Sequence, residues 1–234
     1  MTRLGLIAAL VGLLACAQPH GAAAQEAQWA LRMADATAAL KRRDYADAEA
    51  ELTKALAIAE SFGDRDPRLA RTLHNLGYIF RAQGRLANAE PMYLRALGLQ
   101  EAILGREHLE VAQTLNNLAA VYRESGALDR AEPLYRRSLQ IREKRLGATH
   151  PEVADSLNNL AGVLRLLGHN VEAEALAERA IAIMETAEGG DPAKVATWLY
   201  NLSRLYLEQG RFAEAAKFET RAREIWRAQG TTGR

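Results

Sequence analysis

The chain of 234 residues contains one cysteine, six prolines and few aromatic residues (6%). A single cysteine excludes an internal disulfide, a CxxC redox pair and a cysteine zinc site. The 30 Lys and Arg residues nearly balance the 29 Asp and Glu residues, which excludes a strongly basic nucleic-acid-binding protein and an acidic tail. Alanine and leucine are abundant instead, and this composition favours helices over a sheet sandwich or a disordered chain.

Catalytic and cofactor-binding motifs are also missing. The sequence has no HExxH, no GxSxG, no phosphate-binding glycine loop and no clustered His, Asp and Glu ligands. His108 and His150 stand at matching loop positions directly before predicted helices, where we expect capping or turn packing rather than metal binding. We therefore expect no enzyme activity, no metal and no cofactor.

The first residues have the pattern of an export signal. Arg3 precedes an unbroken apolar or small run over residues 4–17, and residues 21–24 (Gly-Ala-Ala-Ala) follow. This arrangement is typical of a secretory signal peptide, and the apolar run is shorter than the roughly 20 residues that span a bilayer. We expect residues 1–24 to be a signal peptide, so that the mature protein begins at Gln25 and is periplasmic or secreted from a bacterium.

Cys16 offers an alternative to that cleavage site. The segment Leu-Leu-Ala-Cys over residues 13–16 resembles the cleavage box of bacterial lipoproteins, in which the cysteine carries the lipid. We favour the cut after Ala24, because the alanines at 22–24 form the better late site. A membrane association, as an envelope lipoprotein, is expected only if Cys16 is lipidated.

A repeat occupies nearly all of the remaining chain. A five-residue pattern of Leu, a polar residue, Asn, Leu and a small residue recurs every 42 residues, beginning at Leu73, Leu115, Leu157 and Leu199. The turn glycines keep the same spacing, at Gly84, Gly126, Gly168 and Gly210. A spacing held at so many independent positions predicts a repeat architecture.

Each copy describes two helices. In the second copy, Leu115, Leu118 and Val121 share one face of a helix that Gly126 ends. A second helix is expected to begin near Asp129, which we expect to cap it. Its buried stripe is predicted to contain Ala131, Leu134, Tyr135, Ser138 and Ile141.

The segments "HPEVADSLNNLAGVLRLLG" and "AEPLYRRSLQIREKRLG" resemble the tetratricopeptide repeat (TPR), and more narrowly the 42-residue repeats of kinesin light chains. The resemblance covers about residues 43–228. It implies an all-α fold, a right-handed superhelical solenoid of antiparallel helix pairs. The first helices of the pairs would then line a concave groove.

The ends of the chain depart from the pattern. Trp29, Met33, Ala36 and Leu40 predict a first helix over 26–42 in an atypical cap. Glu219 stands in the last copy where the second copy has Tyr135, which suits a terminal cap that meets water. The expected organisation is a degenerate N-terminal capping helix pair at 25–61, repeats at 62–104, 105–146 and 147–188, a C-terminal capping repeat at 189–229 and a disordered tail at 230–234.

Polar residues recur on the helix face that should line the groove. When Ala112 is counted as position 1, positions 5, 6, 9 and 12 lie opposite the apolar face. Position 6 holds Asn75, Asn117, Asn159 and Asn201, and position 5 holds His74, Asn116, Asn158 and Tyr200. Arginines stand at position 12 in the first three copies and at position 9 in the last, as Arg81, Arg123, Arg165 and Arg204.

These rows are candidate peptide-binding residues. Carboxamides offer both a donor and an acceptor to an extended backbone, and arginines hold carboxylates. In the kinesin light chain family the corresponding position-6 asparagines contact bound peptide, which by resemblance implicates the four named above. Alternatively, the asparagines hydrogen-bond neighbouring helices, and the arginines are solvated like the column Arg95, Arg137, Arg179 and Arg221.

The sequence thus predicts a non-catalytic protein–protein interaction scaffold of the cell envelope. Its partner would be a protein or peptide, bound in the concave groove, and not nucleic acid. Two alternatives stay open: a structural module that self-assembles as a homo-oligomer through its exposed ends, and an accessory subunit of an envelope complex.

Overall fold

The computed structural model describes residues 19–230, and within that range it contains ten α-helices and no strand. The helices are α1 (Pro19–Lys41), α2 (Tyr45–Glu60), α3 (Pro67–Ala82), α4 (Leu86–Leu104), α5 (Leu109–Glu124), α6 (Leu128–Leu146), α7 (Pro151–Leu166), α8 (Asn170–Thr186), α9 (Pro192–Glu208) and α10 (Phe212–Ala228). The predicted all-α solenoid is confirmed.

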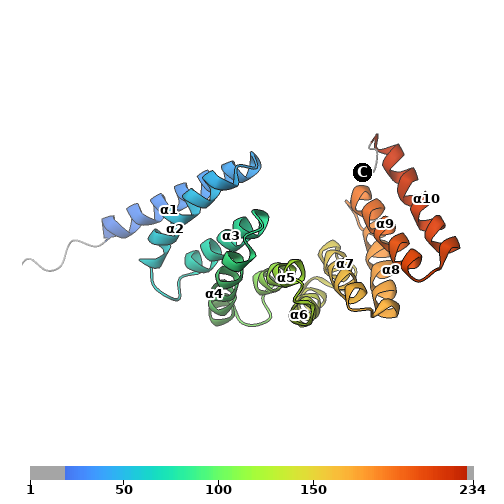
Figure 1. Ribbon diagram of the computed structural model, residues 1–234. Helices are drawn as coiled ribbons and strands as arrows, with labels where there is room; N and C mark the ends of the chain where they lie inside the picture. The colour runs from blue at the N-terminus through green and yellow to red at the C-terminus, as the bar shows by residue number, and fades with distance from the viewer. Residues whose placement is uncertain (1–18, 231–234) are drawn as a thin grey trace, which may run out of the picture.

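Consecutive helices form five hairpins that follow one another along an arc (Figure 1). Each helix packs chiefly against the helix before it and the helix after it. Helices α3, α5, α7 and α9 lie on the inner side of the arc, and α4, α6 and α8 lie on its outer side (Figure 1). The inner helices are those whose residues form the predicted groove.

The inner helices begin at side-chain caps. The His108 and His150 imidazoles each accept the backbone N–H two residues later, at 3.2 Å. The predicted capping role of both histidines is therefore confirmed. The Asp66 carboxylate accepts the backbone N–H of Arg68 at the start of α3 in the same way, at 2.8 Å. Such a bond satisfies one of the amide groups that a helix start leaves without an intrahelical partner.

The outer helices begin differently, and the predicted cap at Asp129 is wrong. Helix α6 starts at Leu128, its N-cap residue is Ala127, and no side chain accepts a hydrogen bond there. The chain turns at Gly126, whose φ is +80°, and the Ala127 N–H then bonds the Tyr122 carbonyl at 2.8 Å. This backbone turn sets the helix start one residue before Asp129, which lies in the first turn instead.

The core runs along the array between the two layers of helices. Tyr93 and Tyr135 are buried at the same position of α4 and α6. The Tyr93 ring lies so close to α3 that a Cβ on Gly77 would stand 3.0 Å from it. Ser138, also buried, donates to the Ala112 carbonyl at 2.7 Å and ties α6 to α5. Small residues thus allow close helix approach, and large rings fill the space between.

The first helix is longer than predicted. Helix α1 begins at Pro19 rather than at residue 26, because the alanine-rich segment has high helix propensity and continues the helix upstream. Residues 21–28 are exposed, whereas Trp29 and Met33 are buried. The predicted core of the cap therefore starts at Trp29.

Two predictions concern residues whose structure is not described. Arg3, the apolar run over 4–17 and Cys16 lie outside the described residues. Most of the predicted tail, residues 231–234, does so as well. Helix α10 ends at Ala228, and of its residues only Ala215 and Ala222 are buried, as expected of a terminal cap. No helix over residues 19–230 has both the length and the apolar character needed to cross a membrane.

The burial pattern of α1 predicts where the folded unit begins. Removing residues 1–24 should change the free energy of unfolding by less than about 0.5 kcal/mol, because residues 21–24 are exposed and Glu26, which binds Arg68 at 3.2 Å, is retained. Trp29→Ala should cost about 3 kcal/mol, since it leaves a cavity and removes the indole N–H that Thr72 accepts at 3.0 Å. Urea unfolding measures both. Equal losses in the two variants would place the boundary upstream of Trp29.

Candidate functional site

Polar side chains of the inner helices are joined from one repeat to the next. The Asn117 amide nitrogen lies 3.3 Å from the Nε2 atom of His74, across the α3–α5 interface. One repeat later, the Asn159 amide donates to the Asn116 oxygen at 3.0 Å. Position 5 of one copy therefore meets position 6 of the next. Asn117 and Asn159 make the inter-helix contacts that the packing alternative expects.

The His74 imidazole contacts two buried side chains, those of Thr114 and Gln100, through a chain of hydrogen bonds. Its Nδ1 lies 2.8 Å from the Thr114 hydroxyl, which itself donates to the Gln100 side chain at 2.7 Å. Because the hydroxyl hydrogen is thus occupied, Nδ1 carries the imidazole proton, and Nε2 is left to accept from Asn117. Burial lowers the pKa of His74 from 6.5 to about 4. The ring is therefore a neutral packing element at physiological pH.

The remaining candidates of these rows have no such partner. Asn75, Asn158 and Asn201 make no side-chain hydrogen bond to any residue between 19 and 230. Tyr200 is 39% exposed, and its ring lies 5.8 Å from the Trp226 ring of α10. The asparagine at position 6 thus has two environments. It is hydrogen-bonded in the two middle copies, at Asn117 and Asn159, and it has no such bond in the first and last copies, at Asn75 and Asn201.

The arginines form a second ladder, also from repeat to repeat. Arg81 binds Glu124 at 2.9 Å, and Arg165 binds Glu208 at 2.7 Å. Arg123 lacks such a contact, since its nearest carboxylate is that of Glu124, at 4.0 Å. Two of the predicted ligand-binding arginines are therefore neutralised within the protein, and Arg123 is not.

Arg204 is the other arginine without a counter-charge. It lies on α9, is exposed, and makes no hydrogen bond or ion pair within the described part of the chain. The position-9 residues of the earlier copies are uncharged, namely Tyr78, Ala120 and Gly162. Among the four arginines predicted to bind a ligand, the two without a close counter-charge are thus Arg123 and Arg204.

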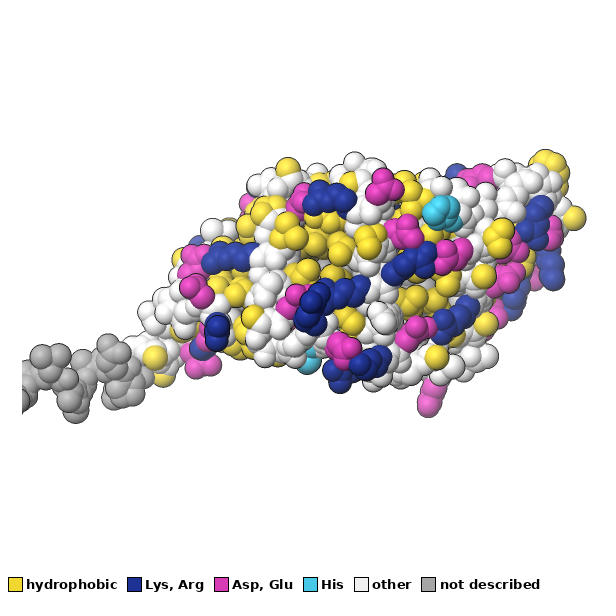
Figure 2. All heavy atoms as spheres, turned by 90° about the horizontal axis from the view of Figure 1, so that it is seen from below, with side chains coloured by type: hydrophobic (Ala, Val, Ile, Leu, Met, Phe, Trp, Pro, Cys, Tyr) yellow, Lys and Arg dark blue, Asp and Glu magenta, His cyan; other side chains and the backbone are white. Residues whose placement is uncertain are grey.

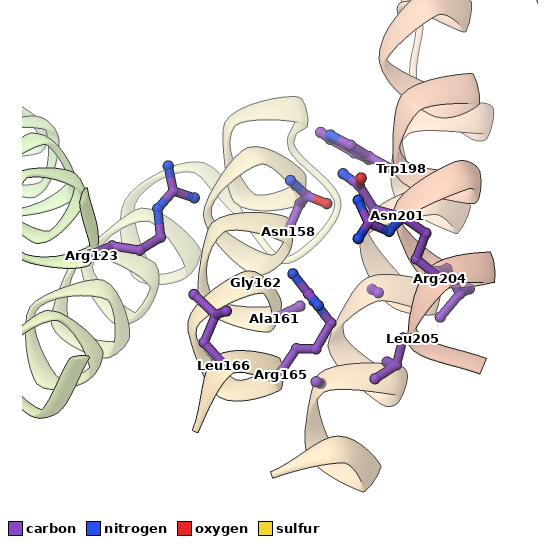
Figure 3. Close-up of a pocket in the computed structure, with 13 residues that line it drawn as sticks. Arg123, Asn158, Ala161, Gly162, Arg165, Leu166, Trp198, Asn201, Arg204 and Leu205 are labelled. Carbon is purple, nitrogen blue, oxygen red and sulfur yellow. The ribbon is translucent and has the colours of Figure 1, made fainter. Parts of the chain in front are cut away.

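A hollow of about 360 Å³ lies between α5, α7 and α9, and both arginines line it, from opposite sides of α7 (Figure 3). This volume is within the range of binding pockets. Its lining combines arginines, asparagines and an apolar floor, and it includes no acidic side chain. The lining residues are Arg123, Asn158, Ala161, Gly162, Arg165, Leu166, Ala173, Ala177, Trp198, Asn201, Leu202, Arg204 and Leu205.

Departures from the repeat pattern accompany the hollow. Ala177 occupies the position that Tyr93 and Tyr135 fill with buried rings in the two preceding outer helices. On α7, Gly162 stands where the other copies have a larger residue. Leu166 stands where the copies of α5 and α9 have Glu124 and Glu208. These residues were not predicted from the sequence, because the prediction rested on positions that stay constant across the copies. Comparing the copies position by position would have found them.

The chemistry of the hollow suits an anion with polar groups beside it. Guanidinium groups bind carboxylates with two hydrogen bonds, and the Asn158 and Asn201 amides can pair with a peptide backbone. No group of three or more metal-ligating side chains occurs among residues 19–230. The outer face differs, because basic and acidic side chains alternate over it without forming a patch of one sign (Figure 2).

The low pKa of His74 predicts a specific acid sensitivity. Its pKa in the folded protein, about 4, lies below the ordinary value of 6.5, so protonation favours the unfolded chain. The stability that the neutral ring contributes is complete above pH 6.5 and is lost as the pH falls to 4. Between these values the wild type should lose up to about 3 kcal/mol more than His74→Asn. Urea unfolding at several pH values measures the difference, and parallel pH profiles would contradict the assignment.

Comparison with solved structures supports the same fold. BtubC (BKLC) from P. vanneervenii is 26% identical, with 93% of this chain and 92% of that chain covered and a TM-score of 0.77. A putative kinesin light chain of Podosopora anserina with nearly identical TPR-like repeats is 23% identical, with 90% and 99% covered and a TM-score of 0.72. The apo form of RapI is 16% identical, with 87% and 72% covered and a TM-score of 0.75. No curated protein sequence matches the chain.

The family comparison covers the whole array of hairpins. The tetratricopeptide repeat family matches residues 25–102, 75–144, 110–186 and 152–228. Repeats of this kind form scaffolds for protein–protein interaction, which agrees with the inner surface described above. The chain belongs to the tetratricopeptide repeat family.

Proposed function

We propose that this protein binds an extended peptide segment of a partner protein along the inner face of its solenoid. The observation that carries the proposal is the hollow between α7 and α9, where polar groups are available that have no partner within residues 19–230. These groups are the Asn158 and Asn201 carboxamides and the Arg204 guanidinium. Arg123 joins them, with no carboxylate closer than 4.0 Å.

The same surface argues for a peptide rather than a compact ligand. Open carboxamides offer both a donor and an acceptor to the N–H and C=O groups of an extended chain, and they do not require a particular side chain. Solenoids of stacked hairpins use their concave surface to hold partners of this shape. The function is binding, and no catalytic group is assigned to it.

Selection from a phage-displayed library of random dodecapeptides tests the proposal. The library is panned against the wild type, and enriched sequences are synthesised for fluorescence anisotropy. The double variant Asn158→Ala, Asn201→Ala should bind them about thirtyfold more weakly, because each of the two lost hydrogen bonds costs about 1 kcal/mol. Its thermal midpoint should stay unchanged, since neither amide bonds another residue of the described range.

Asn159→Ala is the matched control. It removes the bond to Asn116, so it should lower the free energy of unfolding by about 1 kcal/mol. An empty selection against the wild type, or equal binding by the double variant, would refute peptide binding on this face. Light scattering over a concentration series tests the self-assembly alternative, because a peptide receptor of this design stays monomeric.

We further propose that the protein is exported, with a cut after Ala24. The support is the order of Arg3, the apolar run over 4–17 and the small residues at 21–24. The exposure of residues 21–28 agrees with this, since a cut there removes no core residue. Intact-mass measurement of the protein isolated from its native cell should give a chain that begins at Gln25. A chain that begins at a lipidated Cys16, or one that retains Met1, would contradict the cut.

A further inference from the structure

We propose that Leu166 determines where an acidic side chain of the ligand binds in the groove. Leu166 leaves Arg123 without the carboxylate that the next repeat supplies to Arg81 and to Arg165. An acidic side chain of the bound peptide takes that vacant position opposite Arg123. The inference rests on the proposed function, and it adds the ligand's charge and its register along the groove.

The arginine ladder shows what is missing. Arg81 of α3 reaches forward to Glu124 at the end of α5, and Arg165 of α7 reaches forward to Glu208 at the end of α9. Both acids occupy the same position of the repeat, directly after position 12. Between these two steps lies a third, from α5 to α7, and there the corresponding residue is Leu166. The ladder therefore lacks one acid in its middle.

Leu166 cannot replace that acid and is not needed as a core residue. Its side chain is 50% exposed and has no group that accepts a hydrogen bond. The carboxylate nearest to Arg123 belongs to Glu124, which is already bound at 2.9 Å to Arg81. Arg123 consequently carries a full positive charge on the inner face without a close counter-charge.

The surroundings keep this guanidinium accessible. Arg123 extends from α5 toward α7 and lines the hollow (Figure 3). A Cβ atom built on Gly162 would lie 3.9 Å from its Nη1 atom, an ordinary contact distance, so the guanidinium lies beside the backbone of α7 at this glycine. Charge-assisted hydrogen bonds to a carboxylate are about twice as strong as neutral ones, so Arg123 favours a carboxylate over a neutral acceptor.

The other two arginines of the hollow, Arg165 and Arg204, differ in whether a carboxylate binds them. Arg165 is held by Glu208, whereas Arg204, on the α9 side, has no ion pair within the described residues. Arg123 and Arg204 thus lie on opposite sides of α7 (Figure 3). A peptide that crosses α7 would meet a free guanidinium at each side of this helix. We therefore expect it to carry an acidic residue for Arg123 and to tolerate a second one near Arg204.

Supplying the missing acid in the protein tests the inference. In Leu166→Glu, the new carboxylate should bind Arg123 as Glu124 binds Arg81 and should exclude the ligand's acid. A synthetic peptide from the library selection should then lose at least about tenfold in affinity, measured by anisotropy. Leu166→Gln, which has the same shape without the charge, should lose less than about threefold.

Two further measurements make the result specific. Leu94→Glu adds the same charge at a residue of α4 that is 46% exposed, so it controls for net charge and should leave binding unchanged. The peptide's acidic residues are replaced by glutamine one at a time. One replacement should weaken binding to the wild type but leave the affinity for Leu166→Glu and for Arg123→Gln unchanged. Thermal unfolding of each variant verifies that it is folded.

The outcomes separate this inference from the proposed function. Peptides that bind the wild type and bind Leu166→Glu equally well would overturn the role of Leu166 and leave groove binding intact. Equal losses in Leu166→Glu and Leu94→Glu would also overturn it, because the effect would then come from net charge. If no peptide binds the wild type, both proposals fall.

Discussion

No single hairpin of this protein can bury its own apolar side, and the whole structure depends on that constraint. Each pair of helices hides its apolar residues against the next pair, so the core extends along the array as clusters that cross several hairpins. The buried rings of Tyr93 and Tyr135 stand between the two layers of helices. Stability therefore depends on the contacts between neighbouring hairpins, and the same contacts place each inner helix beside the next.

Because the repeats are held in this way, equivalent polar residues also meet across each interface. His74 reaches Asn117, Asn116 reaches Asn159, and Arg81 reaches Glu124. Half of the residues predicted to bind a ligand are thus used within the protein, namely His74, Asn116, Asn117, Asn159, Arg81 and Arg165. Binding capacity remains where a copy departs from its neighbours, and the largest such departure lies at α7, beside Leu166, Gly162 and the hollow over Ala177.

The fold was predictable from sequence because its signals are local and repeated. Apolar spacing, turn glycines and the small residues opposite the large rings each act within one hairpin, so reading one copy describes the others. Two predicted boundaries were wrong, at Asp129 and at the start of α1. In the first case a backbone turn outweighed a capping side chain, and in the second an alanine-rich segment extended the helix beyond its last buried residue.

The sequence by itself determined the all-helical solenoid, the face on which the asparagines and arginines lie, and the near neutrality of the chain. The tertiary structure decided which of those residues are free. Asn117 and Asn201 occupy the same repeat position. Only Asn117 lies against a ring of the preceding repeat, that of His74, which accepts its amide hydrogen. Whether a polar group is satisfied depends on the residue that the neighbouring repeat places within about 3 Å of it, and that distance arises only when the hairpins pack.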